Sequence, residues 1–127
     1  MRRINPDDIA KPASNYVQGV VHTLGGERLV ISGQTGDRPD GSIEEGLEAQ
    51  MRRAWSNLFG VLRAAGFEKR HLVKVTIFVT VPGAVPTARK IREEALEDHL
   101  CASTYLQVAG LARPEYLVEI EAEAVKE

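Results

Sequence analysis

The chain has 127 residues, of which 43% are hydrophobic and 27% are charged. These values are ordinary for a globular protein and predict one domain spanning residues 1–127. The net charge of -2 argues against nucleic acid as a partner, which calls for a clustered basic face. The lack of an apolar run of about 18 residues predicts no membrane span, and the single cysteine, Cys101, excludes an intramolecular disulfide. We therefore expect a cytoplasmic protein, because a reducing compartment suits such a chain.

The first third of the chain predicts a β-hairpin followed by a loop. Residues 16–24 are rich in β-branched and apolar side chains, as is typical of a strand. Gly25 and Gly26 form a hairpin-type turn signal, and residues 28–33 are expected to return as the second strand.

A long amphipathic helix is predicted next. Ser42 and Glu45 have the spacing of a capping box, with Ser42 as the N-cap residue. Gly66 is the expected stop signal after the last turn. Between them, one apolar stripe recurs at helical spacing: Leu47, Met51, Ala54, Leu58, Val61, Leu62 and Ala65.

The second half predicts a strand, a helix and two more strands. Residues 73–81 alternate between apolar and more polar side chains, as a half-buried strand does. Residues 86–100 predict a helix that begins near a proline. Strands are expected over residues 103–109 and 117–124.

The predicted order is ββαβαββ, an α+β class of fold. Two helices are too few to cover both faces of such a sheet, so we expect both to pack on one face. The other face then stays uncovered. Because apolar side chains alternate along the strands, that face predicts self-association.

Three local patterns occur in a fixed order along this framework. They are Asn15-Tyr16-Val17-Gln18-Gly19-Val20, then Ile31-Ser32-Gly33-Gln34, then Cys101-Ala102-Ser103-Thr104-Tyr105 with Val118-Glu119-Ile120-Glu121-Ala122. With these motifs, residues 13–125 resemble the Rid family, also called the YjgF or RutC-like family, whose members hydrolyse reactive enamines and imines. The resemblance implies a chorismate-mutase-like, ferredoxin-like sandwich with a mixed sheet. It also implies a homotrimer with active sites in the clefts between subunits.

Glu119 is the catalytic residue that this resemblance implies. It matches the family acid that positions or activates a water molecule, a task that suits a carboxylate acting as general acid or base. The strand 117–125 places Glu119, Glu121 and Glu123 on one face. The plain alternative is a solvated strand face, which we expect for Glu121 and Glu123.

Tyr16, Ser32 and Gly33 are the substrate-binding residues implied at the N-terminal side. Tyr16 matches a tyrosine that lines the ligand cleft, where a phenol can donate a hydrogen bond to a carboxylate. An equally open alternative is a tyrosine packed at the hydrophobic rim of a strand. Ser32 matches a serine near the bound carboxylate, and Gly33 permits close approach of the backbone.

The last motif departs from the family pattern at two positions. Deaminating members carry an arginine in a Pro-Ala-Arg-Ser segment, and Ser103 stands at the arginine position. That arginine offers a bidentate fork to the substrate carboxylate, so its loss predicts a changed substrate. Tyr105 stands where many relatives have a cysteine and is expected to narrow the cleft. Arg89 and Arg113 are two candidates to compensate, although a solvated helix face is the simpler interpretation of Arg89.

These expectations define two functions. The first is a hydrolytic deaminase of the arginine-lacking branch, which forms a carbonyl compound and ammonia from an imine or enamine without a cofactor. The alternative is a non-catalytic trimer that binds a small metabolite in the same cleft. No histidine and cysteine spacing predicts a metal site. A third function, that of a ribonuclease, fits the sequence poorly because aromatic and basic residues are not interleaved.

Overall fold

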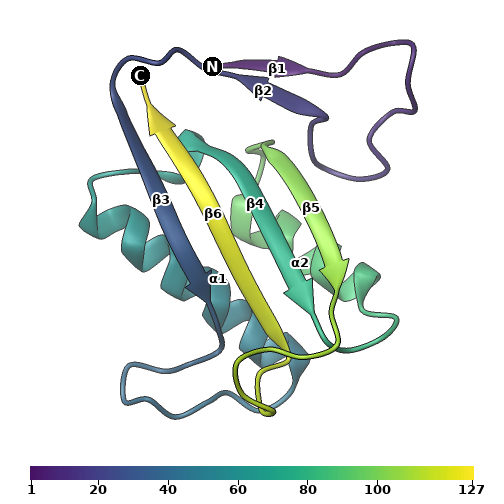
Figure 1. The fold of residues 1–127 in the computed structure, drawn as a ribbon, viewed down its shortest axis with the longest axis vertical. Coiled ribbons are helices and arrows are strands. Elements are labelled where there is room, and N and C mark those ends of the chain that lie inside the picture. The colour runs from purple at the N-terminus through teal and green to yellow at the C-terminus, as the bar shows by residue number, and fades with distance from the viewer.

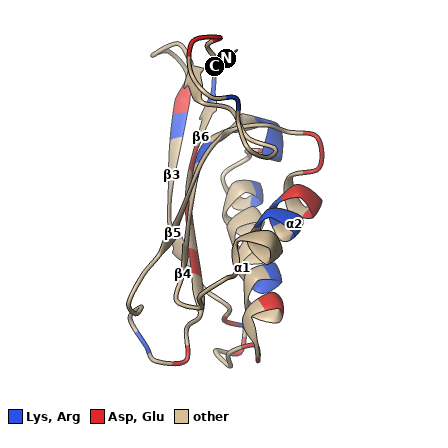
Figure 2. Ribbon diagram, turned by 90° about the vertical axis from the view of Figure 1, so that its right-hand side faces the viewer, with Lys and Arg blue, Asp and Glu red and all other residues tan.

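The computed structural model describes residues 1–127 and has two layers. Strands β3 (Glu27–Gln34), β4 (Leu72–Val79), β5 (Ala102–Gln107) and β6 (Val118–Lys126) form one sheet. Helices α1 (Leu47–Ala64) and α2 (Val85–Leu96) both lie on one side of it (Figures 1 and 2). A short 3-10 turn, η1 (Lys69–His71), precedes β4. The α+β class and the one-sided helix layer are as predicted.

The sheet is mixed, with the order β3-β6-β4-β5. Strand β6, the last in the chain, lies between β3 and β4 and is antiparallel to both. Strands β4 and β5 are parallel, because α2 carries the chain back to the same end of the sheet, as a βαβ crossover does. No helix combines the length and the apolar character that crossing a membrane requires.

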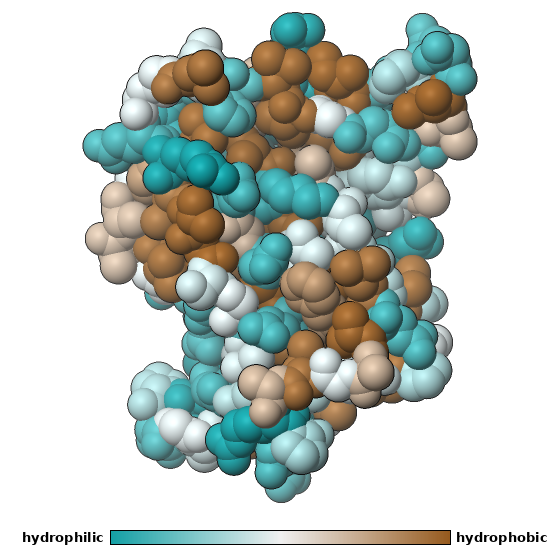
Figure 3. Space-filling view, viewed as in Figure 1, coloured by the Kyte–Doolittle hydropathy of each residue, from teal (hydrophilic) through white to brown (hydrophobic).

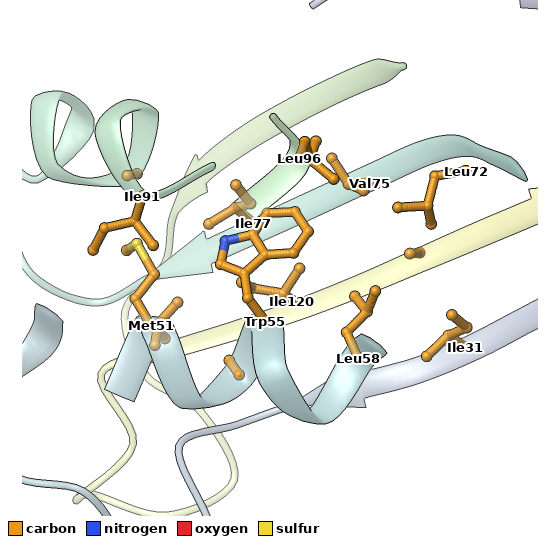
Figure 4. Close-up of a cluster of buried hydrophobic side chains, with 14 of the residues drawn as sticks. Ile31, Met51, Trp55, Leu58, Leu72, Val75, Ile77, Ile91, Leu96 and Ile120 are labelled. Atoms are coloured by element: carbon orange, nitrogen blue, oxygen red, sulfur yellow. The ribbon is translucent and has the colours of Figure 1, made fainter. Parts of the chain in front are cut away.

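The core fills the space between the sheet and α1. Ile77 of β4 faces Ile120 of β6 in the register, and both are at most 1% exposed. Trp55 and Leu58 of α1 pack over them, as Figure 4 shows. The helical stripe predicted from the sequence supplies much of this layer, and Gly66 ends the helix with φ 76°, the left-handed conformation that glycine adopts readily.

The other face of the sheet has no helix over it. Glu119 and Glu123 of β6 point to this side, because their strand neighbours Ile120 and Ala122 point to the core. The register places Val30 beside Glu123 on the same side, where it is 61% exposed. Figure 3 shows hydrophobic side chains scattered among polar ones on this face. The expectation of an uncovered, partly apolar face is therefore confirmed.

The predicted N-terminal hairpin is wrong. The chain forms β1 (Arg2–Ile4), which the sequence reading missed, and β2 (Gly19–Val21) pairs with β1 instead of with β3. Before β2, the Val17 amide donates to the Cys101 carbonyl at 3.1 Å, which ties this segment to the start of β5. After β2, the Thr23 amide and hydroxyl donate to the Glu127 carboxylate. These contacts hold the chain away from β3, so the element order has one strand more than ββαβαββ.

The predicted capping box is also wrong. Helix α1 starts at Leu47 after Gly46, with no side-chain cap. The Ser42 amide and hydroxyl instead donate to Asp40 Oδ1, at 2.9 and 2.6 Å. Aspartate and serine often close a turn in this way, in competition with a helix start.

The second helix begins one residue before the predicted position and ends earlier. It starts at Val85, with Pro86 in the first turn as expected. It stops at Leu96 because Glu97 takes φ 57°, a conformation that interrupts a right-handed helix. Residues 97–101 then lead to β5.

Substitution Leu58→Ala should destabilise the fold strongly. Leu58 is fully buried between α1 and the sheet, and removing such a side chain leaves a cavity that costs about 2–5 kcal/mol. Urea unfolding followed by circular dichroism, at a fixed protein concentration, measures the loss. Leu24→Ala is the control, because Leu24 is 98% exposed and its loss should change the unfolding free energy by at most about 0.5 kcal/mol. Equal effects of the two substitutions would contradict this core.

Two histidines should make the fold sensitive to mild acid. Burial is the main cause that lowers the pKa of His99 below its ordinary value of 6.5, although its contact with the Leu72 carbonyl opposes this. Burial also lowers the pKa of His71, followed by the charge of Arg70. The unfolded chain therefore binds protons more readily than the folded chain as the pH falls below 6.5, so stability should decrease there.

Urea unfolding at several pH values from about 5 to 8 measures this loss. The decrease should be smaller in a His99→Gln variant, which cannot take up the proton. The same slope in both proteins would show that His99 does not contribute.

Candidate functional site

A pocket of about 260 Å³ lies between α2, β5 and the segment before β2. Ser103 and Tyr105 reach it from β5, because the register pairs them with the core-facing Val75 and Ile77 of β4. The pocket therefore opens on the helix side of the sheet. Its walls are Ser14, Tyr16, Ile77, Val85, Ala88, Arg89, Arg92, Ser103 and Tyr105. Four of the predicted substrate-binding residues come together here: Tyr16, Arg89, Ser103 and Tyr105.

Arg92 is the pocket residue that the sequence analysis did not single out. It lies on α2 and is only 6% exposed. Its Nη1 donates to Ser103 Oγ at 3.2 Å and its Nη2 donates to Ser14 Oγ at 2.9 Å. Burial lowers the pKa of Arg92, but the ordinary pKa of arginine is so high that the guanidinium keeps its charge. The available signal was its place beside Ile91 and four residues after Ala88, next to the buried side of the helix.

Tyr16 is brought to the pocket by the backbone of its neighbour. Val17 is anchored to Cys101 at the start of β5, which leaves the Tyr16 ring beside Arg92, with 5.9 Å between the guanidinium carbon and the ring centroid. This is a cation–π arrangement. Tyr105 is half-buried, and burial raises its pKa. The Tyr105 phenol is therefore a protonated donor near neutral pH.

Glu119 lies on the opposite face of the sheet. It is paired with Phe78, one residue along from the core-facing Ile77 and Ile120. The half-buried Glu119 side chain has neither a salt bridge nor a hydrogen bond. Gly33 of β3 lies directly against it, since a Cβ at Gly33 would come within 2.6 Å of Glu119 Cδ and 2.8 Å of its Cγ. Glycine at position 33 is thus what lets the Glu119 carboxylate lie over β3.

Ser32 and Arg113 lie outside the pocket. Ser32 is exposed on β3 and borders a shallow depression of about 180 Å³ on the open face, with Lys74 and Thr76. Arg113 is in the loop between β5 and β6. It pairs with Glu115 at 3.5 Å and stacks over the Tyr116 ring, and it is not among the residues that line the pocket.

Cys101 is unsuited to nucleophilic chemistry. It is 2% exposed, and burial raises the pKa of its thiol to about 11. A thiol rather than the reactive thiolate is therefore present near neutral pH. No three His, Cys, Asp or Glu side chains are arranged to hold a metal ion.

The two halves of the site have complementary chemistry. The pocket contains arginines, hydroxyls and phenols but no carboxylate. The open face offers the free carboxylate of Glu119 beside Gly33. Since the sheet separates them, one chain does not bring Glu119 and Arg92 to the same ligand.

Comparison with known proteins agrees with this fold. The family model described as Endoribonuclease L-PSP matches residues 7–126. A "2-iminobutanoate/2-iminopropanoate deaminase" of Salmonella typhimurium is 32% identical over 87% of each chain. A RutC family protein of Aquifex aeolicus is 32% identical over 99% of this chain and 100% of its own.

Solved structures show the same architecture. The Rid-family protein YyfB of Yersinia pestis, of unknown function, superposes with a TM-score of 0.86 at 30% identity, over 98% of both chains. The YjgF gene product of Escherichia coli superposes with a TM-score of 0.74 at 29% identity, over all of both chains. The chain therefore belongs to the Rid, or YjgF, family and has its chorismate-mutase-like fold.

Substitution Gly33→Ala should be costly only while Glu119 keeps its side chain. The backbone at Gly33 is not left-handed, and the three heavy atoms nearest to an added methyl group all belong to Glu119. We expect Gly33→Ala to cost about 1–3 kcal/mol, and to cost clearly less in a Glu119→Ala background. A double-mutant cycle by urea unfolding measures this coupling.

Gly110→Ala is the control, because nothing lies within 4 Å of a Cβ at Gly110. Additive effects of Gly33→Ala and Glu119→Ala would mean that the two residues do not touch in solution.

Proposed function

We propose that this protein hydrolyses a reactive imine, or its enamine tautomer, to a carbonyl compound and ammonia. The observation that carries the proposal is the Glu119 carboxylate, half-buried over Gly33 and free of any ion pair or hydrogen bond. A carboxylate held in this state is available to a water molecule. The names of the similar deaminases support the same reaction class.

The chemistry requires one water molecule and no redox step. Glu119 orients the water and takes its proton as the oxygen attacks the carbon of the C=N bond. The nitrogen is protonated, and the resulting carbinolamine loses ammonia as the C=O bond forms. Because the imine carbon is already electrophilic, the proposed reaction uses no cofactor. We place it in the cytoplasm, as the single, unpaired Cys101 favours.

The active site is proposed to form between copies of the chain. Glu119 and the pocket around Ser103 lie on opposite faces of one sheet. If the open face of one copy meets the β5 side of the next, Glu119 of one chain faces the pocket of the other. Such a contact joins two different surfaces and forms a ring when the rotation between copies closes. The ring we propose is a homotrimer of single Rid-family domains, residues 1–127. The exposed Val30 and Leu106 on the open face favour burial in this interface.

The substrate preference is proposed to differ from that of the named deaminases. Ser103 stands at the position where the resemblance places an arginine, so the carboxylate fork from β5 is missing. Ser103, Tyr105, Tyr16 and Arg89 are proposed to bind the substrate from one copy. Ser32 and Gly33 are proposed to contribute from the neighbouring copy, together with Glu119. Arg113 is proposed to approach the substrate from the loop between β5 and β6.

Substitution Glu119→Gln should remove turnover while leaving the fold intact. The amide keeps the shape of the side chain but cannot accept the proton of water, and loss of a general base costs about 10²- to 10⁴-fold. Ammonia release from freshly generated imines measures the effect. The panel contains 2-iminobutanoate, a bulkier unsaturated amino acid imine and an imine without a carboxylate.

Glu121→Gln is the matched control, because Glu121 lies on the same face of β6 and is exposed; it should retain turnover. Full activity of Glu119→Gln would refute the mechanism. Ligand binding without acceleration of any imine would instead support the alternative, a metabolite-binding trimer. Sedimentation of the wild type measures its oligomeric state and so tests whether the site is shared between copies. A monomeric wild type would rule out a shared site.

A further inference from the structure

Arg92 carries a buried positive charge for which the fold provides no counter-ion. None of the ion pairs of the chain includes it. No Asp or Glu lines its pocket, and the other charged group there is Arg89, also positive. Removing a charge from water without a partner is expensive. An anion bound beside a buried arginine in this state would stabilise its charge.

Its hydrogen bonding is incomplete as well. A guanidinium has five N–H donors, and this one makes two hydrogen bonds, one to Ser103 and one to Ser14. The Nε atom is buried without any partner. Groups buried this deeply are nearly always hydrogen-bonded in folded proteins. The free N–H groups therefore indicate that an acceptor from outside the chain is missing.

We infer that Arg92, and not a residue of β5, supplies the counter-charge for a ligand carboxylate in the pocket between α2 and β5. The two serine hydroxyls that accept from Arg92 fix its plane, as a guanidinium needs for paired contacts with a carboxylate. Arg92 comes from a helix and not from β5, so the anchor enters the pocket from another direction than a residue at position 103 would. The inference deepens the proposed function. Binding of the carboxylate end of the ligand does not require turnover, so only the chemistry at the reacting end of the ligand rests on the proposed function.

The walls define the chemical class of the ligand. Ile77, Val85 and Ala88 form an apolar side, whereas Tyr16 and Tyr105 present phenols. Arg89 is exposed at the same pocket and adds to its positive field. With a volume of about 260 Å³, the pocket suits a small organic acid with a short apolar chain.

A purely structural role for Arg92 makes different predictions. In that case Arg92 only ties the segment at Ser14 to β5 at Ser103. Its removal would then lower stability, but the folded variant would bind an acid as well as the wild type does. A binding site instead requires that the carboxylate itself is recognised.

Calorimetry with 2-oxobutanoate, an unreactive small acid, tests the site without any turnover. The wild type should bind 2-oxobutanoate and should not measurably bind 2-butanone, its neutral counterpart. Arg92→Gln should weaken the binding of 2-oxobutanoate by about ten- to a hundredfold. Lys90→Gln is the control, because Lys90 is exposed on the same helix and lies outside the pocket; it should bind normally.

A second variant and a second readout cover a failure of Arg92→Gln to fold. Arg92→Lys keeps the charge but loses the fork, so it should bind with intermediate affinity. In the wild type, the NMR signal of the Arg92 Nε–H should shift on titration with 2-oxobutanoate and not with 2-butanone. The inference would be overturned if the wild type bound 2-butanone as tightly as 2-oxobutanoate. It would also be overturned if folded Arg92 variants bound 2-oxobutanoate normally.

Kinetics separate this inference from the proposed function. Arg92→Gln should raise KM for 2-iminobutanoate and leave KM for a carboxylate-free imine unchanged. Carboxylate-specific binding without any turnover would retain the site and reject the deaminase. Turnover of 2-iminobutanoate with an unchanged KM in Arg92→Gln would retain the deaminase and reject the role of Arg92.

Discussion

The alternation of side chains along β6 is the constraint on which the rest of the structure depends. This strand lies between β3 and β4, so it has no free edge. Val118, Ile120, Ala122 and Ala124 therefore all enter the core, and the glutamates between them all reach the open face. A shift of one residue would bury three carboxylates and expose the apolar row, which strongly disfavours any other register. The position of Glu119 follows directly from this packing requirement.

The same alternation divides the candidate site into two halves. On β5, the register with β4 turns Ser103 and Tyr105 toward α2, whereas Glu119 is turned the other way. The helix side carries an arginine without an anion, and the open side carries a carboxylate without a cation. These two unpartnered charges of opposite sign, on opposite faces, are the basis of the proposed contact between copies.

Sequence patterns predicted the long elements well and the short contacts poorly. Residues 47–64 and 72–79 have strong periodicity, and burial of their apolar sides dominates the local energy. The first hairpin was mispredicted because a Gly-Gly turn signal is local, whereas the partner of β2 is chosen by contacts with β1, Cys101 and Glu127 that are distant in sequence. The Ser42 cap was mispredicted because Asp40 accepts from the Ser42 amide, which Glu45 would bind in a capping box.

The sequence by itself determined the class of fold, the family resemblance and the face on which Glu119 lies, because each follows from periodicity and motif order along the chain. Only the tertiary structure decided that Gly33 lies under Glu119, that Tyr16 joins β5, and that Arg92 is buried against Ser14 and Ser103. The physical reason is that an arginine on a helix surface is ordinarily solvated. Its burial depends on which distant segment packs beside the helix, and local patterns do not encode that packing.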